Sequence, residues 1–249
     1  MSKRFGCSLL VLIFLFSGLG VKASFLDEQL QYSRVRAAYQ SKKDLISQEL
    51  SKKGLESTNF QLLIKAYKYE QLVKVYVKGK TDEKWSLYKT IPFCWTSGEL
   101  GPKRQEGDLQ IPEGFYSINH FNPYSNFHLS LGVSYPNKSD KIKSPHSRKG
   151  GAIYMHGGCA TIGCIPIEDE PIKEVYILAV LGRNNGQSKV PIHIFPFEYS
   201  EEKMKVASTE FPEHVNFWKN LFEVEEKFNK EKIQGKVSID AKGNYFLNN

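Results

Sequence analysis

Alternating hydrophobic and polar positions mark the first half of the chain. Between Phe60 and Trp95, apolar residues alternate with lysines and other polar residues, and Tyr69-Glu70 and residues 79–83 separate these runs as turn candidates. A period of two over short runs is typical of half-buried strands joined by turns, so this region predicts a β-meander. Further strand-like runs follow at Phe115–Ile118, Phe127–Val133, Gly151–His156 and Val190–Phe195.

Helical patterns flank the strand-like runs. Residues 27–53 are rich in helix formers and lack Gly and Pro, which predicts one helix that ends at Gly54. Residues 171–181 have apolar positions at spacings of three and four and predict a second helix. A third is predicted near the C-terminus, behind possible caps at Ser208 and Thr209. Its apolar stripe, which we expect to dock against the sheet, consists of Phe211, Val215, Trp218 and Phe222.

These elements predict a fold that is mainly β with flanking helices, in the α+β class. The segment from Thr96 to Gly114 is crowded with Gly, Pro and charged residues, so we expect a long loop there. A loop of this length inside a compact domain is usually functional. After Gly235, the pattern predicts a short hairpin.

The N-terminal segment has the pattern of a secretory signal peptide. Lys3 and Arg4 precede the apolar run Leu9–Leu19, and Val21 and Ala23 occupy the −3 and −1 positions of a small-residue cleavage site. We expect residues 1–23 to be removed. The alternative is an uncleaved membrane anchor, because the run is near the short end of what crosses a bilayer. Either way the protein is predicted to be exported, to the periplasm or cell envelope.

Composition and charge exclude several classes. With 249 residues, 41 % hydrophobic and 24 % charged, the chain is neither disordered, nor collagen-like, nor a multi-span membrane protein. The formal charge is +7, and cleavage of the predicted signal would remove three positive charges. Nucleic-acid binding normally requires a dense basic face, so no nucleic-acid partner is expected.

Removal of residues 1–23, which contain Cys7, would leave three cysteines in the exported protein: Cys94, Cys159 and Cys164. An oxidising compartment pairs cysteines, so an odd number means that at least one thiol stays free or pairs between chains. A free thiol retained in an exported protein needs a reason, and nucleophilic catalysis is one.

The segment 154–167 contains the most informative motif. His156 ends a strand-like run, a Gly-rich loop follows, and Cys164 begins the next apolar run. A neighbouring imidazole can take the proton of a thiol and so activate it as a nucleophile. The glycines permit a sharp turn, and we expect the N–H groups of Gly163 and Cys164 to be unpaired and directed at a developing oxyanion.

Three other interpretations of these cysteines stay open on the residues alone. Cys159 and Cys164 could form a disulfide that closes a small ring. His156 and the three cysteines could instead hold a structural zinc ion. Finally, Cys94 and Cys159 could be buried small hydrophobic residues.

The motif resembles that of the L,D-transpeptidases, a family of YkuD-domain cysteine enzymes of peptidoglycan. The family pattern, a His-Gly pair followed by Ser/Thr-x-Gly-Cys, corresponds to His156-Gly157 and Thr161-Ile162-Gly163-Cys164. The short loop between the two parts is similar to the YafK-like subgroup. The resemblance covers roughly residues 32–225 and includes Ser97-Gly98, Gly101-Pro102-Lys103, Glu106-Gly107-Asp108, residues 112–116, Tyr135-Pro136-Asn137 and residues 193–197.

The resemblance implies a YkuD-like mixed β-sandwich catalytic domain and a thioester mechanism on peptidoglycan stem peptides, without a metal or other cofactor. Cys164 would be the nucleophile and His156 its base, and the backbone carbonyl of Gly157 would orient the imidazole. Gly163 would contribute to the oxyanion site. An amine of a second stem peptide would resolve the thioester into a crosslink. Water would instead give hydrolysis, with release of a terminal D-residue or of a peptidoglycan-linked envelope protein.

The chain departs from many family members at Pro166, where they have an arginine. Lys103 and Arg104 in the long loop are candidates to supply the missing charge for a substrate carboxylate. Tyr154 and Thr161 are further candidates for substrate binding, and Cys159 is expected to be a buried free thiol or a reversible partner of Cys164. A non-catalytic envelope-binding module, stabilised by zinc or a disulfide, is the alternative from another class.

We therefore expect four parts. Residues 1–23 form the signal peptide and residues 24–58 an N-terminal helical segment. Residues 59–200 form the L,D-transpeptidase catalytic domain, and residues 201–249 form a C-terminal helix and short hairpin packed on it. The sequence leaves the oligomeric state open.

Overall fold

The computed structural model describes residues 23–248, so the predicted signal peptide lies, apart from Ala23, outside the described residues. A curled mixed sheet forms the centre, with strand order β3-β2-β1-β8-β4-β5-β6-β7. The pairs β1–β8 and β6–β7 are parallel and the other pairs are antiparallel. The strands are β1 (Gln61–Tyr67), β2 (Leu72–Lys78), β3 (Ser86–Pro92), β4 (Gly114–Asn122), β5 (Ser130–Val133), β6 (Tyr154–His156), β7 (Ile165–Pro166) and β8 (Pro191–Phe195).

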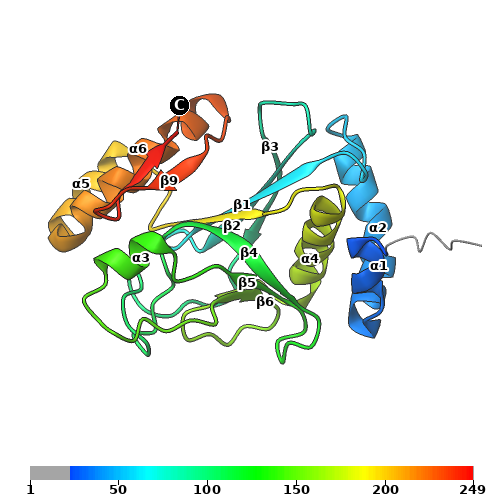
Figure 1. The fold of residues 1–249 in the computed structure, drawn as a ribbon, viewed down its shortest axis with the longest axis horizontal. Helices are drawn as coiled ribbons and strands as arrows, with labels where there is room; N and C mark the ends of the chain where they lie inside the picture. The colour runs from blue at the N-terminus through cyan, green and yellow to red at the C-terminus, as the bar shows by residue number, and fades with distance from the viewer. Residues whose placement is uncertain (1–22, 249) are drawn as a thin grey trace, which may run out of the picture.

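Helices lie on two sides of this sheet (Figure 1), which confirms the predicted fold class of a mixed β domain with flanking helices. The meander β1–β2–β3 is also confirmed. Both faces of β1 are buried: Leu62 and Ile64 join the core under the N-terminal helices, and Leu63 joins a separate cluster with Phe228. A strand covered on both faces shows a nearly continuous apolar run, so the alternation in β1 is weaker than in an open sheet.

On one side, α4 (Asp169–Asn184) packs on the sheet, and α1 (Phe25–Leu30) and α2 (Ser33–Ser51) pack on α4 (Figure 1). The single helix predicted over 27–53 is therefore wrong, because the chain breaks between Leu30 and Ser33. Tyr32 is extended there, with φ −84° and ψ 123°. Its ring meets the edge of Tyr124 with centroids 5.3 Å apart. The break thus coincides with a contact between residues 92 positions apart in the chain. The helix propensity of residues 27–53 gives no sign of the break.

On the other side lie α5 (Glu201–Glu210), a 3₁₀ turn (Pro212–His214), α6 (Val215–Glu231) and the hairpin β9 (Val237–Ile239) and β10 (Tyr245–Leu247). The predicted docking of α6 is confirmed, since Trp218 and Phe222 pack with Phe195 at the end of β8 and with Phe197 just after it. The predicted hairpin is confirmed by the antiparallel pairing of β9 and β10. Ser208 and Thr209 are not helix caps, and Phe211, the first residue of the predicted stripe, is the C-cap of α5 and lies before α6.

Ser208 and Thr209 end a helix that the sequence analysis missed, α5, and their hydroxyls bond back to Met204 and Lys205 carbonyls. The cap of α5 is Ser200, whose hydroxyl accepts from the Lys203 amide. Only Ala207 of α5 is buried, so no apolar stripe marks the helix in the sequence.

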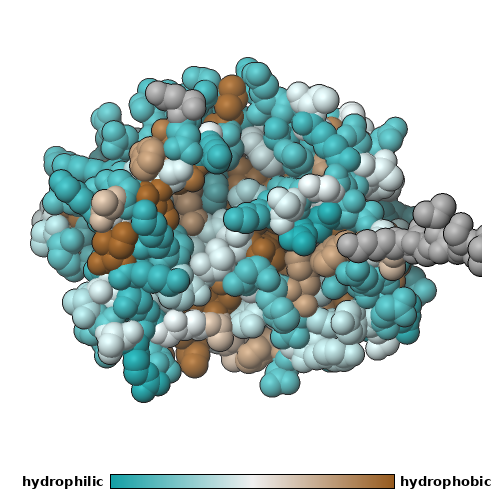
Figure 2. All heavy atoms as spheres, in the orientation of Figure 1, coloured by the Kyte–Doolittle hydropathy of each residue, from teal (hydrophilic) through white to brown (hydrophobic). Residues whose placement is uncertain are grey.

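The segment between β3 and β4 is a long loop, as predicted, and a short helix, α3 (Lys138–Lys143), packs beside it. No helix of residues 23–248 is long and apolar enough to cross a bilayer. On the face shown in Figure 2, hydrophobic side chains gather in small separate groups between polar ones.

Candidate active site

His156 is the last residue of β6, where it pairs with Ser130 of β5. Its side chain is buried, and its Nδ1 lies 2.5 Å from the carbonyl oxygen of Gly157. A carbonyl only accepts hydrogen bonds, so Nδ1 carries the proton and Nε2 is left with a free lone pair. Burial lowers the pKa of His156, and the bond to Gly157 opposes this shift. The neutral imidazole is thus the favoured form, which is the form a general base requires.

One face of the imidazole is covered. Phe127, in the loop between β4 and β5, stacks on the His156 ring with centroids 4.6 Å apart and planes 28° from parallel. The aromatic face keeps water from this side of the ring. This contributes to the burial that lowers the pKa of His156.

Cys164 precedes β7, the strand that runs parallel beside β6. Gly163 takes φ 126°, a conformation that residues with a Cβ rarely adopt, and turns the chain into β7. The Cys164 Sγ accepts a hydrogen bond from the Tyr154 amide at 3.4 Å and faces the Ala152 carbonyl at 3.8 Å. In this parallel pair Met155 lies opposite Ile165 and His156 lies opposite Pro166, so Cys164 lies beside the start of β6 and His156 at its end. The thiol and the imidazole therefore belong to neighbouring short strands.

Burial raises the pKa of the Cys164 thiol, while the Tyr154 amide and the charge of Lys103 lower it. Both pKa shifts favour the neutral forms of the pair. The raised pKa means that the Cys164 thiol holds its proton more firmly, and the lowered pKa means that His156 accepts a proton less readily. A thiolate–imidazolium pair is accordingly disfavoured at rest. The arrangement suits proton transfer to His156 during attack on a substrate.

Thr161 shapes the loop before Cys164. Its hydroxyl accepts from the amides of Gly163 (3.2 Å) and Cys164 (2.7 Å) and donates to the Cys164 carbonyl (2.9 Å). The expectation that these two amides are unpaired is wrong for this structure. The physical reason is a threonine that folds back on its own loop, as Ser and Thr often do in turns.

The cysteine pairing differs from the expectations. Cys159 is neither a buried free thiol nor a partner of Cys164, because it is exposed and forms a disulfide with Cys94, 65 residues away. The Cys94 amide bonds to the Pro166 carbonyl (3.0 Å), so the end of β3 lies beside the motif. Cys164 is free. The proposed zinc ligand set does not fit, since two of its three sulfurs are joined to each other.

Two hollows flank the Cys164 thiol, and both are also lined by Ala152. The smaller, of about 310 Å³, contains His156 and is lined further by Tyr154, by Asn122 at the end of β4 and by the loop residues Tyr124, Ser125, Asn126 and Phe127. The larger, of about 620 Å³, is lined by Lys103, Glu106, Leu109, Arg148 and Ile162 among others. Tyr154 thus lies where a substrate-binding residue was predicted, whereas Thr161 lines neither hollow.

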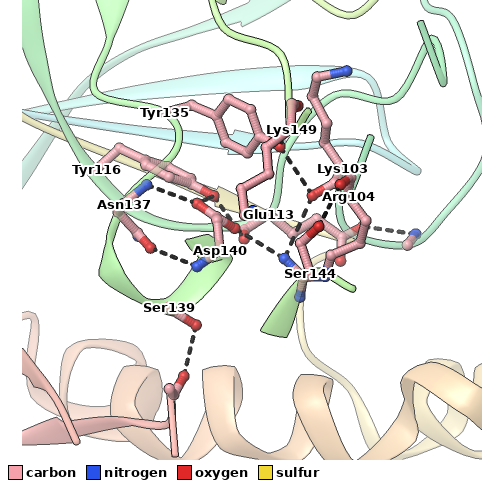
Figure 3. A network of polar contacts seen from close by, with 12 residues as sticks. Lys103, Arg104, Glu113, Tyr116, Tyr135, Asn137, Ser139, Asp140, Ser144 and Lys149 are labelled. Carbon is pink, nitrogen blue, oxygen red and sulfur yellow. Dashed lines mark hydrogen bonds and ion pairs between the residues drawn. The ribbon is translucent and has the colours of Figure 1, made fainter. Parts of the chain in front are cut away.

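Lys103 and Arg104, the two cations predicted to bind a substrate carboxylate, lie in different surroundings. Lys103 reaches the larger hollow, but its ammonium is already paired with Asp108 at 2.5 Å. The Arg104 guanidinium donates to Asp140 at 2.9 Å (Figure 3). Its guanidinium also lies 5.0 Å from the ring centroid of Phe217. Arg104 therefore holds the loop to α3 and α6 and lines neither hollow.

Burial raises the pKa of Asp140, the partner of Arg104, to about 6, against the opposing effect of Arg104 and the Asn137 backbone.

Arg148, with an exposed side chain, lines the larger hollow and was missed by the sequence analysis. It belongs to no motif, and only the fold brings residues 148 and 164 together.

Comparisons with known proteins agree with this site. The YkuD family, described as the L,D-transpeptidase catalytic domain, matches residues 63–194. YafK of Escherichia coli K12, named as an L,D-transpeptidase, is 30 % identical over 186 residues, which are 74 % of this chain and 72 % of the relative.

Two solved structures are more distant. Pgp2 of Campylobacter jejuni, a helical cell shape determining protein, has a TM-score of 0.43 at 17 % identity, covering 78 % of this chain and 80 % of that one. L,D-transpeptidase 1 of Mycobacterium tuberculosis has a TM-score of 0.31 at 15 % identity, covering 54 % and 62 %. The family assignment rests on the two sequence matches.

A free thiol and a buried imidazole that line the same hollow are the pair of groups found in thiol-dependent enzymes. The matched residues include both groups. The chain belongs to the L,D-transpeptidase (YkuD) family, and its similarity to YafK supports the YafK-like subgroup.

Proposed function

We propose that the protein is an exported, cysteine-dependent L,D-transpeptidase of the periplasm or cell envelope that acts on peptidoglycan stem peptides. One observation carries the proposal: in a chain of this family, the free thiol of Cys164 and the buried imidazole of His156 line the same hollow. Family membership supports the substrate class, and the geometry supports the roles of the two residues.

The Cys164 sulfur attacks the carbonyl between the L-centre of a diamino acid and the following D-residue. As the C–S bond forms, His156 Nε2 takes the thiol proton. Collapse of the tetrahedral intermediate breaks the C–N bond, and His156 gives the proton to the departing amine. A thioester remains on Cys164. The amine of a second stem peptide then attacks the thioester carbonyl, and His156 accepts the proton of the amine. The C–S bond breaks, the crosslink is released, and His156 returns the proton to the Cys164 sulfur.

This proton path orients the substrate. The departing amine must lie beside His156, so the smaller hollow receives the leaving D-residue and afterwards the incoming amine. The acyl part then occupies the larger hollow, where each cation already has a carboxylate partner: Lys103 pairs with Asp108, and Arg148 pairs with Glu106 at 2.8 Å. The amides of Gly163 and Cys164 can bind the oxyanion only if the Thr161 hydroxyl turns away from them.

Turnover with defined muropeptides tests the proposal. Purified protein is incubated with a tetrapeptide stem, with and without an acceptor amine. The expected result is a new crosslink in the presence of the acceptor. Cys164→Ala abolishes it, and His156→Ala lowers the rate by about 10²–10⁴-fold. His146→Ala, which removes an exposed histidine outside both hollows, is the matched control and leaves the rate unchanged.

Two other results would redirect the proposal. Release of the D-residue or of a linked envelope protein without a new crosslink would identify a hydrolase of the same bond. If Cys164→Ala changed nothing and muropeptides bound without turnover, the protein would be a disulfide-stabilised binding module.

A further inference from the structure

Arg34 makes a long-range contact with the rim of the smaller hollow. It lies in the first turn of α2, and its Nη1 donates to the carbonyl oxygens of Ser125 (2.7 Å) and His128. These carbonyls belong to the loop between β4 and β5, more than 90 residues away along the chain. The guanidinium is half-buried, so its two donors replace water at both carbonyls.

The loop needs such support because it has a strained backbone. His128 takes φ 66°, which is unfavourable for a residue with a Cβ and persists only where the surroundings enforce it. Inside the loop, the Phe127 amide bonds to the Ser125 hydroxyl (3.0 Å). The carbonyls that Arg34 holds therefore lie on either side of Phe127 in the sequence.

Phe127 in turn contacts the candidate base. Its ring stacks on the His156 imidazole, and the amide of Gly157 donates to the carbonyl of Leu129, the last residue of the loop (3.2 Å). A contiguous set of contacts thus runs from α2 through the loop to His156. Tyr32 and Tyr124 add an edge-to-face contact between the same two segments.

We infer that Arg34 is a positioning residue for His156, because it holds the β4–β5 loop so that Phe127 shields the imidazole and fixes the wall of the smaller hollow. The inference deepens the proposed function of the same site and rests on it for its effect on turnover. Its effect on the histidine itself does not depend on any activity.

Other charged groups near this region stay in place when Arg34 is changed. The imidazole shares its hollow with the Cys164 thiol. At the start of α4, the Asp169 carboxylate accepts from the Gly158 amide (2.9 Å), and Glu170 and Lys173 lie near His128. His128 itself flanks Gly157. A change in His156 on loss of Arg34 is therefore to be compared with a variant that keeps the positive charge.

The test is an NMR titration of the His156 ring, with its signal assigned by its loss in His156→Gln. In Arg34→Ala, the loop loosens, water reaches the ring, and the pKa of His156 rises toward its ordinary value. Phe127→Leu produces a shift of the same sign. In the double variant Arg34→Ala/Phe127→Leu, the pKa of His156 shifts no more than in the single variant with the larger shift, because both changes remove the same aromatic cover of the imidazole.

Two variants serve as controls. Arg34→Lys keeps the charge but loses the planar two-donor geometry, and we expect an intermediate shift. Arg36→Ala removes an exposed neighbour that bonds only to Leu30 and Gln31 carbonyls, and it leaves the pKa of His156 unchanged. The inference is overturned if folded Arg34→Ala leaves the His156 titration unchanged, if Arg34→Lys restores it fully, or if Arg36→Ala shifts it equally.

Turnover gives a second readout. Arg34→Ala lowers kcat/KM by about tenfold or more through lost positioning, and moves the acid limb of the pH profile upward with the NMR-determined pKa. If the wild-type protein shows no turnover while the NMR shifts occur as expected, the proposed function fails and the positioning role stands. Turnover in the wild type with identical pH limbs in Arg34→Ala overturns the inference alone.

Discussion

At the residue scale, the site consists of a buried imidazole and a half-buried thiol that both favour their neutral forms. Burial raises the pKa of Cys164 and lowers that of His156. A preformed ion pair would need the opposite shifts. In the proposed mechanism the thiol therefore loses its proton only during attack on the substrate. Nδ1 of His156 is bonded to the Gly157 carbonyl, so Nε2 is the nitrogen that can accept this proton.

The direction of the His156 shift predicts the pH dependence. In the proposed mechanism the neutral imidazole is the active form, and a lowered pKa keeps the imidazole neutral at lower pH. As pH falls, kcat/KM should therefore persist below about 6.5, the ordinary value for histidine, and decline only through the lowered pKa. A pH–rate profile measures this. An acid limb above the ordinary value would contradict the assigned shift.

The same shifts predict slow alkylation of Cys164 near neutral pH. The rate with iodoacetamide should rise with pH up to values above the usual thiol range, because only the thiolate reacts. A rate already maximal at neutral pH would instead indicate a resting thiolate–imidazolium pair.

Thr161 provides a prediction about the loop. Thr161→Val removes the hydroxyl that pairs the Gly163 and Cys164 amides, and should lower the free energy of unfolding by about 1–3 kcal/mol. Thr161→Ser keeps the hydroxyl and should lose much less. Urea unfolding of the two variants measures the difference. Equal losses would show that the methyl group, not the hydrogen bonds, stabilises the loop.

The sequence motif located Cys164, His156 and the Gly157 carbonyl, because all three lie in one short segment whose pattern limits the backbone. It could not locate the disulfide partner of Cys159, since Cys94 is brought near by the end of β3. Arg34 carries no signal in the sequence for the same reason. Its role exists only through a contact with a loop from another part of the chain.

At the element scale, a buried network ties the long loop to the C-terminal helix. The Lys68 ammonium bonds to the carboxylate of Glu113 (2.9 Å) and to the Gly101 carbonyl (2.6 Å). The other oxygen of Glu113 accepts from the Trp218 indole of α6 (2.7 Å). Lys68 and Glu113 are almost fully buried, so each needs the other as a partner.

Glu113→Ala should therefore destabilise the protein strongly, by about 3–5 kcal/mol, because it leaves the Lys68 charge buried and unpaired. Trp218→Phe removes one hydrogen bond from the network and some packing, and should lose less. Glu226→Ala, at an exposed pair on α6, is the control and should change stability by less than about 0.5 kcal/mol. Equal effects of Glu113→Ala and Glu226→Ala in urea unfolding would contradict this account.

The disulfide joins the end of β3 to the loop between His156 and Cys164. A link across 65 residues restricts the unfolded chain, so the double variant Cys94→Ala/Cys159→Ala should lose about 4 kcal/mol of stability in the chain-entropy model. With residues 1–23 removed, and Cys7 with them, the variant should still have one alkylatable thiol, at Cys164. Mass spectrometry after alkylation checks this, and loss of labelling at Cys164 would show that the free thiol was misassigned.

The predicted elements held where hydrophobic periodicity was strong, as in the meander and α6. The predictions were wrong where tertiary contacts determine the backbone conformation. The break between α1 and α2 coincides with the Tyr32–Tyr124 contact, and α5 has a single buried residue and hence no stripe. Local sequence describes such segments poorly because their conformation is fixed by what they pack against.

At the scale of the whole molecule, the sheet carries Cys164 and His156, and helices on opposite sides hold the loops around them (Figure 1). The N-terminal helices contact the β4–β5 loop through Arg34, and α6 contacts the β3–β4 loop through Trp218. Each hollow beside Cys164 is thus bordered by a loop that depends on a different helical layer. The terminal helical regions belong to the architecture of the site.

The most direct test of the central claim is the intact mass of the protein after incubation with a tetrapeptide stem and no acceptor amine, followed by fragmentation. The account predicts a covalent acyl adduct on Cys164 that disappears, with formation of a crosslink, when the amine is added. Substrate consumption with no adduct on Cys164, or an adduct on another residue, would contradict it.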